Sequence, residues 1–468
     1  QKTTESPDSL KMSLWKTQIF ELQQEYQKLS DTLENKYPDY YQLKYNIEVT
    51  TVEDLQKHLV EKEETLLEYF VGKKNVYIFV ITSTDIKIHS IPNNATLKKH
   101  FEALLSTLKI SPSKASDKEQ AYLSYLYSAH WIYKNLVQTV LPPKNTPEDI
   151  GQLIVIPDGI MGYIPFEVLL MEYPTNTGKI LFDLNHLDYL IEEYSISYAY
   201  SSSLLLEGLQ DEEKSSWHTK ENYVGFAPVF EQQENGFTHR KKGSCLASEL
   251  EELEESEEEV KKLGKKMDGI IFLKEDATKE NFMKYAPNKR ILHLATHACL
   301  SQADPMSNTI HFVNDYLLTS DLFNIRLDAD LAILSACNTG SGILSPGEGI
   351  MSLSRGFLYA GCPSIITSLW SVNDKAAADI VLNLHDNLLE GQSKNDALRS
   401  AKLQYMESVP NRLRAPYFWG AFVHVGNPKP IEWDFPSKGF GWIIGFILVL
   451  SSIGFYLRKM NYRQSQTL

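Results

Sequence analysis

Cysteine is scarce in this sequence, and no two cysteines form a metal-binding pair. Four cysteines occur in the chain, namely Cys245, Cys299, Cys337 and Cys362. None of them belongs to a C-x-x-C motif, which argues against a zinc ribbon. They could form two disulfides in an oxidising compartment, although their spacing does not require any.

Positive charge is also in deficit. Lys and Arg number 46 against 60 Asp and Glu, so the formal net charge is −14. Phosphate backbones are bound by clustered Lys and Arg, and we therefore expect no nucleic-acid partner. The glycine-rich segment 340–349 does not have the G-x-G-x-x-G spacing, which disfavours a dinucleotide-binding fold. We expect no cofactor.

The composition is that of a folded protein. Hydrophobic residues make up 43% and aromatic residues 11% of the 468 residues, which argues against a mostly disordered chain. This length allows two or three domains. The chain begins at Gln1 without an initiator methionine, so we expect a fragment or a processed product.

The first 65 residues predict helices. Apolar residues recur at steps of three or four between Leu10 and Leu29, and Pro38 interrupts the pattern. We interpret residues 1–65 as a helical hairpin or as the end of a truncated helical-repeat array.

Beyond this segment the chain alternates between predicted strands and helices. Short apolar runs predict strands at 66–71, 75–82, 86–91, 152–159, 195–201, 223–230, 269–273, 291–297, 331–337 and 364–370. Periodic stretches predict helices at 95–140, 249–263, 276–286, 349–361, 374–389 and 394–407. Thr278 is placed to begin one of these helices and Gly361 to end another. The alternation indicates a largely parallel sheet covered by helices on both faces.

Three further stretches are predicted to be exposed. The polar segments 209–222 and 231–246 predict loops, and the segment 340–349 predicts a flexible loop beside a cleft. The acidity of the helix at 249–263 predicts a solvated face rather than a cation site.

An apolar segment near the C-terminus predicts a single transmembrane helix. Residues 439–457 carry no charge, and about 20 helical residues span a bilayer core. Trp433, Trp442 and Tyr456 lie near the ends of this segment, where interfacial aromatics are common. The basic tail at 458–468 favours a cytoplasmic tail, with the folded part on the periplasmic or exterior side. A buried core helix is the alternative.

Two predicted strands end in residues that can act on a carbonyl group. The first ends in HLATHA at 293–298 and the second in SACNTG at 335–340. Carboxyl ends of parallel strands meet at one edge of a sheet, so neighbouring strands would bring His297 close to Cys337. An imidazole can take a thiol proton and return it to a leaving amine, which makes this pair a candidate base and nucleophile. The backbone N–H groups of Ala298 and Cys337 could bind an oxyanion.

Other interpretations of these residues remain open. His293, His297 and Cys299 could bind a metal ion, although three ligands on one short strand end seldom converge. Cys337 alone could be a buried core thiol, and a packing role is the simpler interpretation of Cys299 and Cys362.

Together the motifs resemble those of the CHAT domain family. HLATHA, SACNTG, the segment 347–374 and IPDGIMGYIPFEVL at 156–169 carry this similarity, which extends from about Leu66 to Gly426. The family belongs to the caspase–separase clan of cysteine peptidases and commonly follows tetratricopeptide repeats. The resemblance implies that the catalytic residues are His297 and Cys337.

The resemblance also implies a domain organisation. The expected fold is an α/β, caspase-like helix–sheet–helix sandwich, preceded by helices and followed by the transmembrane helix. Residues 66–208 would form a pseudo-caspase half without a dyad, and residues 209–430 the active half.

The sequence departs from the clan at two positions near the dyad. Many clan members have Gly after the catalytic histidine, whereas this chain has Ala298, which would be strained if the backbone required a positive φ. Some basic-specific members have Asp two residues before the cysteine, whereas this chain has Ser335, so a preference for Arg or Lys does not follow from that position. Ser335, His293 and Asp374 are candidate substrate-pocket residues, and Asp374 could instead be a helix N-cap.

These observations predict a membrane-anchored cysteine endopeptidase that cleaves a protein substrate through an acyl-enzyme. A protein activator is expected as a further partner. The alternative is a catalytically silent CHAT scaffold that only binds other proteins.

Overall fold

The computed structural model describes most of the chain between residues 50 and 433. The described residues are 22, 24, 25, 28, 50–59, 64–110, 118–141, 150–174, 183–215, 221–230, 253–301, 304–313, 315–335, 339–345 and 349–433. The chain divides into two compact units, Gln1–Ile431 and Glu432–Leu468. All helices and strands discussed below belong to the first unit.

Several predictions fall outside the described residues. They include the transmembrane helix at 439–457, the basic tail, the loop at 231–246 and most of residues 1–65. Within the part of the chain that the structure describes, no helix is both long and apolar enough to cross a bilayer. In the N-terminal segment, the described α3 (Val52–Leu59) confirms one helix.

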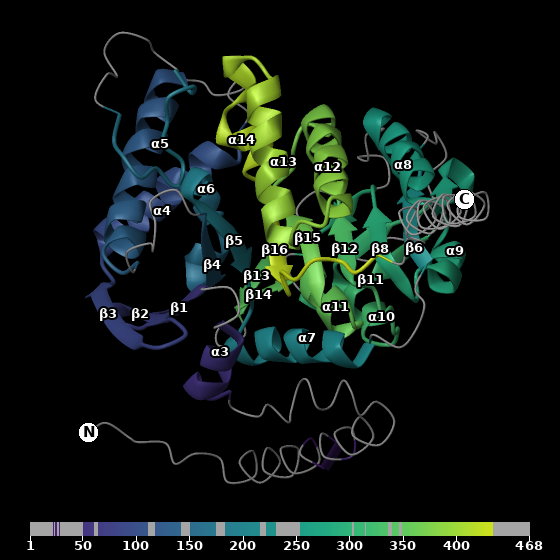
Figure 1. Cartoon of the computed structure of the whole chain (residues 1–468), viewed down its shortest axis with the longest axis horizontal. Helices are drawn as coiled ribbons and strands as arrows, with labels where there is room; N and C mark the ends of the chain where they lie inside the picture. The colour runs from purple at the N-terminus through teal and green to yellow at the C-terminus, as the bar shows by residue number, and fades with distance from the viewer. Residues whose placement is uncertain are drawn as a thin grey trace, which may run out of the picture. The chain divides into compact units, whose positions relative to one another are not determined.

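One large mixed sheet organises the first unit, and Figure 1 shows it between helices on both faces. Its strand order is β3-β2-β1-β4-β5-β16-β15-β12-β8-β6-β7. The strands are β1 (Thr65–Val71), β2 (Asn75–Ile81), β3 (Ile86–Pro92), β4 (Gly151–Ile156), β5 (Tyr194–Tyr198), β6 (Glu221–Ala227), β7 (Ile270–Leu273), β8 (Lys289–Leu294), β12 (Leu331–Leu334), β15 (Ser364–Ser368) and β16 (Phe422–Gly426). Neighbours pair in parallel except for β1–β2, β2–β3 and β15–β16. The predicted parallel pairing is therefore confirmed for two blocks, β1-β4-β5-β16 and β15-β12-β8-β6-β7, which meet at the antiparallel β15–β16 pair.

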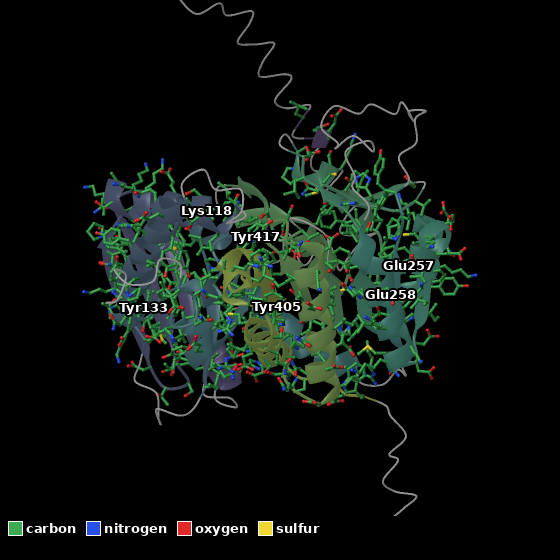
Figure 2. The ribbon with its side chains drawn as sticks, turned by 90° about the horizontal axis from the view of Figure 1, so that it is seen from above. Lys118, Tyr133, Glu257, Glu258, Tyr405 and Tyr417 are labelled. Atoms are coloured by element: carbon green, nitrogen blue, oxygen red, sulfur yellow. The ribbon has the colours of Figure 1, made fainter. Side chains whose placement is uncertain are left out.

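Two layers of helices cover this sheet (Figure 1). One layer contains α4 (Ala95–Leu108), α5 (Lys118–Tyr133), α6 (Leu190–Glu193), α8 (Glu254–Met267), α12 (Asp374–Leu389), α13 (Lys394–Ser408) and α14 (Pro416–Trp419). The opposite layer contains α3, α7 (Ser202–Ser215), α10 (Thr319–Leu322) and α11 (Leu353–Tyr359), with α9 (Lys279–Tyr285) near the β7 edge. Figure 2 looks down on the first layer, with Glu257 and Glu258 of α8 at one end and Lys118 and Tyr133 of α5 at the other.

Hydrophobic burial explains why the second half of the chain forms this arrangement. Strand residues such as Phe226, Leu294 and Leu334 are fully buried against Phe357 of α11 and Phe282 of α9. These strands are apolar on both faces, as strands covered by two helix layers must be. Burial of this kind provides most of the stability of the sheet, at about 25 cal/mol per Å² of apolar surface.

Local capping chemistry fixes several helix ends. The Thr278 side chain accepts a hydrogen bond from the Asn281 N–H and begins α9, as predicted. Gly361, with φ of +86°, follows α11 in the left-handed conformation that glycine tolerates. The N-cap of α12 is Asn373, which accepts from the Ala376 N–H, so the N-cap interpretation of Asp374 is wrong by one residue.

Two predicted segments differ from the structure. Residues 209–215, predicted as part of a loop, belong to α7, whose Leu205, Leu206 and Leu209 are buried in a core cluster with α3. Residues 349–352, predicted to be helical, form β14 (Gly349–Ser352), which pairs with β13 (Gly342–Ser345) as an antiparallel hairpin. Residues 342–345 and 349 of the predicted flexible loop at 340–349 are therefore in paired strands.

Candidate active site

The two strand ends that carry the candidate dyad are neighbours. Strands β8 and β12 pair in parallel with Leu294 opposite Leu334, and the Ser335 N–H donates to the Leu294 carbonyl oxygen at 3.0 Å. His297 and Ser335 therefore follow adjacent strands at the same carboxyl edge of the sheet. Cys337 lies outside the described residues, so its distance from His297 stays a prediction.

A small three-stranded sheet positions the backbone of His297. Its strands are β9 (Ala298–Cys299), β10 (Thr309–His311) and β11 (Tyr316–Leu318). The His311 N–H donates to the His297 carbonyl oxygen at 2.9 Å, and Ala298 pairs with Ile310. Ala298 does not have a positive φ, so an alanine at this position causes no backbone strain of the kind that a glycine would relieve. The role of its N–H in binding an oxyanion stays a prediction.

Aromatic and imidazole groups surround the His297 side chain. The Phe230 ring lies 5.1 Å from the His297 ring, centroid to centroid, at an angle of 55°. Burial, together with the nearby His297, lowers the pKa of His311 to about 4, so His311 is neutral at pH 7. Sequence reasoning missed both neighbours: Phe230 was assigned to a strand that ends at Ala227.

Thr339 and Gly340 of the SACNTG motif are held against β15. Thr339 is fully buried and accepts hydrogen bonds from the Thr367 hydroxyl at 2.8 Å and from the Ser368 N–H at 3.4 Å. The Gly340 N–H donates to the Ser368 carbonyl oxygen at 2.9 Å. A Cβ at Gly340 would lie 2.8 Å from Thr367 Cγ2, which explains why a glycine is needed there. The Thr-Gly pair of SACNTG thus anchors the segment that follows the candidate nucleophile.

A small pocket lies at this edge of the sheet. It is lined by Leu253, Ser256, Glu259, Thr296, Ser335, Ser368, Val372, Asp374, Ala377 and Phe422. The pocket brings together Ser335 and Asp374, which were predicted from separate segments. Thr296 precedes His297 and Ser335 lies two residues before Cys337, so the pocket lining includes residues next to both members of the candidate dyad in sequence. Binding of substrate there stays a prediction.

His293 lies beneath this pocket rather than in its wall. Its side chain is fully buried, and its Nδ1 lies 2.8 Å from the hydroxyl of Tyr223. Its Nε2 lies 2.9 Å from Glu259 Oε1, an ion-pair distance without the angle of a hydrogen bond. His293 is therefore buried in contact with Glu259, and a role for it in substrate binding stays a prediction.

Glu259 is a pocket residue that the sequence analysis did not single out. Its side chain is only 3% exposed, in contrast to the predicted solvated face of α8. Glu258 on the same helix is 59% exposed and lies 3.8 Å from Lys261 Nζ. The helical spacing could have indicated its burial, because Glu259 lies four residues before the buried Leu263 and therefore on the same face of the helix.

The described cysteines differ in their bonding. Cys362 is not disulfide-bonded and is fully buried in the core, which confirms the predicted packing role. Cys299 is 3% exposed and disulfide-bonded, so packing alone does not account for it. Among the described residues, no three His, Cys, Asp or Glu side chains are grouped to hold a metal ion.

The sequence was compared with models of known protein families. The model of the CHAT domain matches residues 127–427, which is more than half of the chain. This chain belongs to the CHAT domain family. The predicted resemblance is thereby confirmed.

Curated relatives and a solved structure extend this comparison. Tetratricopeptide repeat protein 28 of Mus musculus is 28% identical over 137 residues, and its Homo sapiens counterpart is 26% identical over 137 residues. These matches cover 29% of this chain and only 5% of either relative. Separase of Saccharomyces cerevisiae, solved in complex with securin, is similar in structure with a TM-score of 0.50 at 11% identity. That likeness covers 80% of this chain and 31% of separase, and it shows that the CHAT domain has the separase-like, caspase-like fold.

The first half of the CHAT domain contacts the β13–β14 hairpin. The Tyr163 hydroxyl, in the motif IPDGIMGYIPFEVL, donates to the Gly342 carbonyl oxygen at 2.7 Å. A Cβ at Gly162 would lie 2.7 Å from Ile350 Cδ1, so the motif and the hairpin are in close contact. The Tyr200 hydroxyl lies 2.9 Å from Ser352 Oγ. The motif therefore supports the segment after the candidate nucleophile.

A buried ion pair also joins the two parts of the CHAT domain. Glu167 of the same motif lies 3.0 Å from the Lys402 ammonium of α13, and their side chains are 4% and 1% exposed. The Tyr198 hydroxyl donates to the other carboxylate oxygen of Glu167 at 2.6 Å. Burial lowers the pKa of Lys402, while Glu167 acts in the opposite direction.

Proposed function

We propose that this CHAT domain is a cysteine endopeptidase, with Cys337 as nucleophile and His297 as base. The pairing of β8 with β12 carries this proposal. Leu294 lies opposite Leu334, and the histidine and the cysteine each follow three positions beyond their paired leucine. The carboxyl edge of a parallel sheet is where reacting groups gather in open α/β folds.

The chemistry needs only these residues, a peptide and water. His297 accepts the thiol proton, and the thiolate forms a C–S bond with the scissile carbonyl carbon. The N–H groups of Ala298 and Cys337 would bind the oxyanion. The C–N bond breaks as His297 returns the proton to the leaving amine, which leaves a thioester. A water activated by His297 then hydrolyses the thioester and regenerates the thiol.

The surroundings of His297 suit a role as base. Because the pKa of His311 is lowered to about 4, that ring adds no positive charge beside His297 at pH 7. The small sheet holds the His297 carbonyl, and the ring of Phe230 limits the motion of the imidazole. Such a support keeps a base within reach of its partner.

Alkylation of the reduced full chain tests this assignment without knowledge of the substrate. Iodoacetamide reacts with thiolate, so Cys337 should react at pH 6–7 at a rate that falls at least tenfold in His297→Ala. His186→Ala is the matched control, because this histidine is 84% exposed and remote in sequence from HLATHA and SACNTG. Peptide mapping by mass spectrometry measures modification of Cys337 separately from the other cysteines.

A second arm tests peptidase chemistry itself. A panel of peptidyl acyloxymethyl ketones with varied side chains before the reactive group should label Cys337, and His297→Ala should abolish labelling. A folded protein whose Cys337 reacts no faster than a free thiol, independently of His297, and resists every probe would instead support the scaffold function. The membrane anchor at 439–457 is a separate part of the proposal, tested by cysteine accessibility of the tail in intact cells.

A further inference from the structure

One face of the antiparallel strands β1, β2 and β3 carries apolar side chains that the described helices leave uncovered. Alternate residues of a strand share a face, and residues paired across two strands share it too. Phe70 is paired with Tyr77, and their ring centroids lie 6.4 Å apart. On β3, Ile88 is paired with the half-buried Phe79, which is two positions from Tyr77 along β2. Phe70 is 58% and Ile88 62% exposed. The exposed residues of this face, Phe70, Tyr77, Ile86 and Ile88, form the β1–β3 patch.

The same face of the sheet is covered a few residues away from the patch. Leu66 of β1 and Ile81 of β2 are paired, and both are buried with Leu55 of α3 in one core cluster. Ile86 is paired with Ile81, so the buried cluster continues into the exposed patch. Figure 1 shows this end of the sheet, with α3 beside α7 and β3 as the edge strand. A contiguous exposed apolar surface of this kind marks an interaction site.

The chain that precedes α3 is joined to the domain beside this patch. The Thr50 hydroxyl donates to Ser203 Oγ at 3.1 Å, at the start of α7. The neighbouring Ser202 hydroxyl donates to Glu68 Oε2 at 2.9 Å. Glu68 is paired with Phe79, so its side chain is on the patch face of the sheet. Residues 1–49 therefore start from a point close to the patch.

That preceding segment contains an apolar stripe of its own. Apolar residues recur at helical spacing, so one face of the predicted helix is apolar. The stripe consists of Leu10, Leu14, Ile19, Leu22, Tyr26 and Leu29. The described residues of this segment are 22, 24, 25 and 28, which are helical and exposed, and Leu22 is 64% exposed. A single helix of this length is stabilised mainly by packing of its apolar face, so the stripe needs an apolar partner.

We infer that residues 10–29 form a helix whose apolar stripe packs on the β1–β3 patch. Residues 30–49 connect the stripe to Thr50, and a chain of that length can extend over about 65 Å, so the stripe can reach the whole patch. The tether through α3 keeps the stripe at a high effective concentration beside the patch, which favours this occupant over a separate molecule. The packing would add a helix beside α3 and fix the N-terminal segment on the CHAT domain. This inference is independent of the proposed peptidase function.

Hydrogen exchange of the full chain, followed by mass spectrometry, tests this packing. The backbone amides of residues 10–29 should exchange at least about tenfold more slowly in the unmodified chain than in Ile88→Asp, because a carboxylate in the patch opposes burial of the stripe. Leu22→Asp should remove the same protection from the other side of the contact, and it leaves the sheet unchanged. Met283→Asp is the matched control, because this exposed apolar side chain is on α9, near the β7 edge of the sheet.

A double variant shows whether the two residues act through one contact. Because either charge alone breaks the packing, the chain with both Ile88→Asp and Leu22→Asp should exchange no faster at residues 10–29 than either single variant. The amides of β1 and β2 report the fold of the sheet in the same experiment. If Ile88→Asp unfolds the sheet, Phe70→Ser and Leu22→Asp decide the question.

Three results would overturn the inference. Exchange of residues 10–29 at the rate of an unstructured peptide in the unmodified chain would show that the stripe is not packed. Slow exchange that neither Ile88→Asp nor Phe70→Ser accelerates would show that the stripe packs on another surface. A dimer in light scattering that Ile88→Asp dissociates and Leu22→Asp leaves intact would assign the patch to a second copy of the chain.

Discussion

Replacing Lys402 by methionine should destabilise the CHAT domain more than almost any surface change. Lys402 and Glu167 form an ion pair with side-chain exposures of 1% and 4%, so neither charge can reach water when its partner is removed. Breaking such a pair costs about 3–5 kcal/mol, because the remaining charge stays unpaired in the interior. The Tyr198 hydroxyl still donates to Glu167 in the variant, which places the expected loss near the lower end, at about 3 kcal/mol.

A double-mutant cycle measures whether the two charges act together. Glu167→Gln and Lys402→Met each leave one buried charge, whereas the double variant leaves none. Replacing both partners of a buried pair is often nearly neutral, so the double variant should lose less stability than Lys402→Met alone. The assay is equilibrium unfolding in guanidinium chloride followed by tryptophan fluorescence, with thermal melting as a second probe.

The control and the refuting result are both specific. Lys57→Met breaks the ion pair with Asp54, whose side chains are 74% and 48% exposed, and should not shift the unfolding midpoint measurably. A Lys402→Met loss below about 1 kcal/mol would contradict the premise that an unpaired charge remains buried. The premise would also be contradicted if the double variant lost as much free energy of unfolding as the two single variants lose together.

Three further predictions concern the pH dependence of stability, the contact between Tyr163 and β13, and the effect of a reductant on Cys337. Burial lowers the pKa of His385 to about 3, below the unfolded value of 6.5, so the stability that neutral His385 provides is lost as pH falls from about 6.5 toward 3. Between pH 7 and pH 5, the free energy of unfolding should therefore fall by about 2 kcal/mol less in His385→Leu than in the unmodified chain. Denaturant unfolding at the two pH values measures this difference. Tyr163→Phe removes the hydrogen bond to Gly342 and should slow probe labelling of Cys337 several-fold, with a stability loss of about 1 kcal/mol at most. Cys299 is disulfide-bonded two residues after His297, so a reductant should raise the rate of Cys337 alkylation.

Each of these has a contradicting result. Parallel pH profiles of His385→Leu and the unmodified chain would show that His385 does not titrate in this window. Labelling of Tyr163→Phe at the unmodified rate would show that the contact with β13 does not position the nucleophile. Alkylation of Cys337 that is equally fast before and after reduction would exclude control by the Cys299 disulfide, and peptide mapping without reduction would identify its partner.

The regular elements follow largely from local sequence. Helix α12 has the predicted bounds of Asp374–Leu389, and Thr278 caps α9 as its side-chain chemistry requires. Local patterns succeed here because a cap, a helical stripe or an apolar strand depends on residues within a few positions of each other. The ends of β8 and β12 could be located for the same reason.

The hairpin and α7 were beyond those patterns. Residues 342–345 and 349–352 form paired strands, and the first half of the chain contacts them through a Tyr163–Gly342 hydrogen bond that joins residues 179 positions apart. The polar end of α7 continues a helix whose leucines are buried against α3. Such contacts are tertiary, and no short window of sequence contains both partners.

The sequence by itself determined the family, the positions of most strands of the large sheet and of several helices, and the two motifs that end β8 and β12. Only the tertiary structure decided which side chains surround them: Glu259 is buried in a pocket wall, His293 lies below it, and Phe230 and His311 flank His297. The physical reason is that burial and charge balance depend on every element that contacts a residue. The sequence of α8 alone cannot distinguish a solvated glutamate from one that closes a pocket.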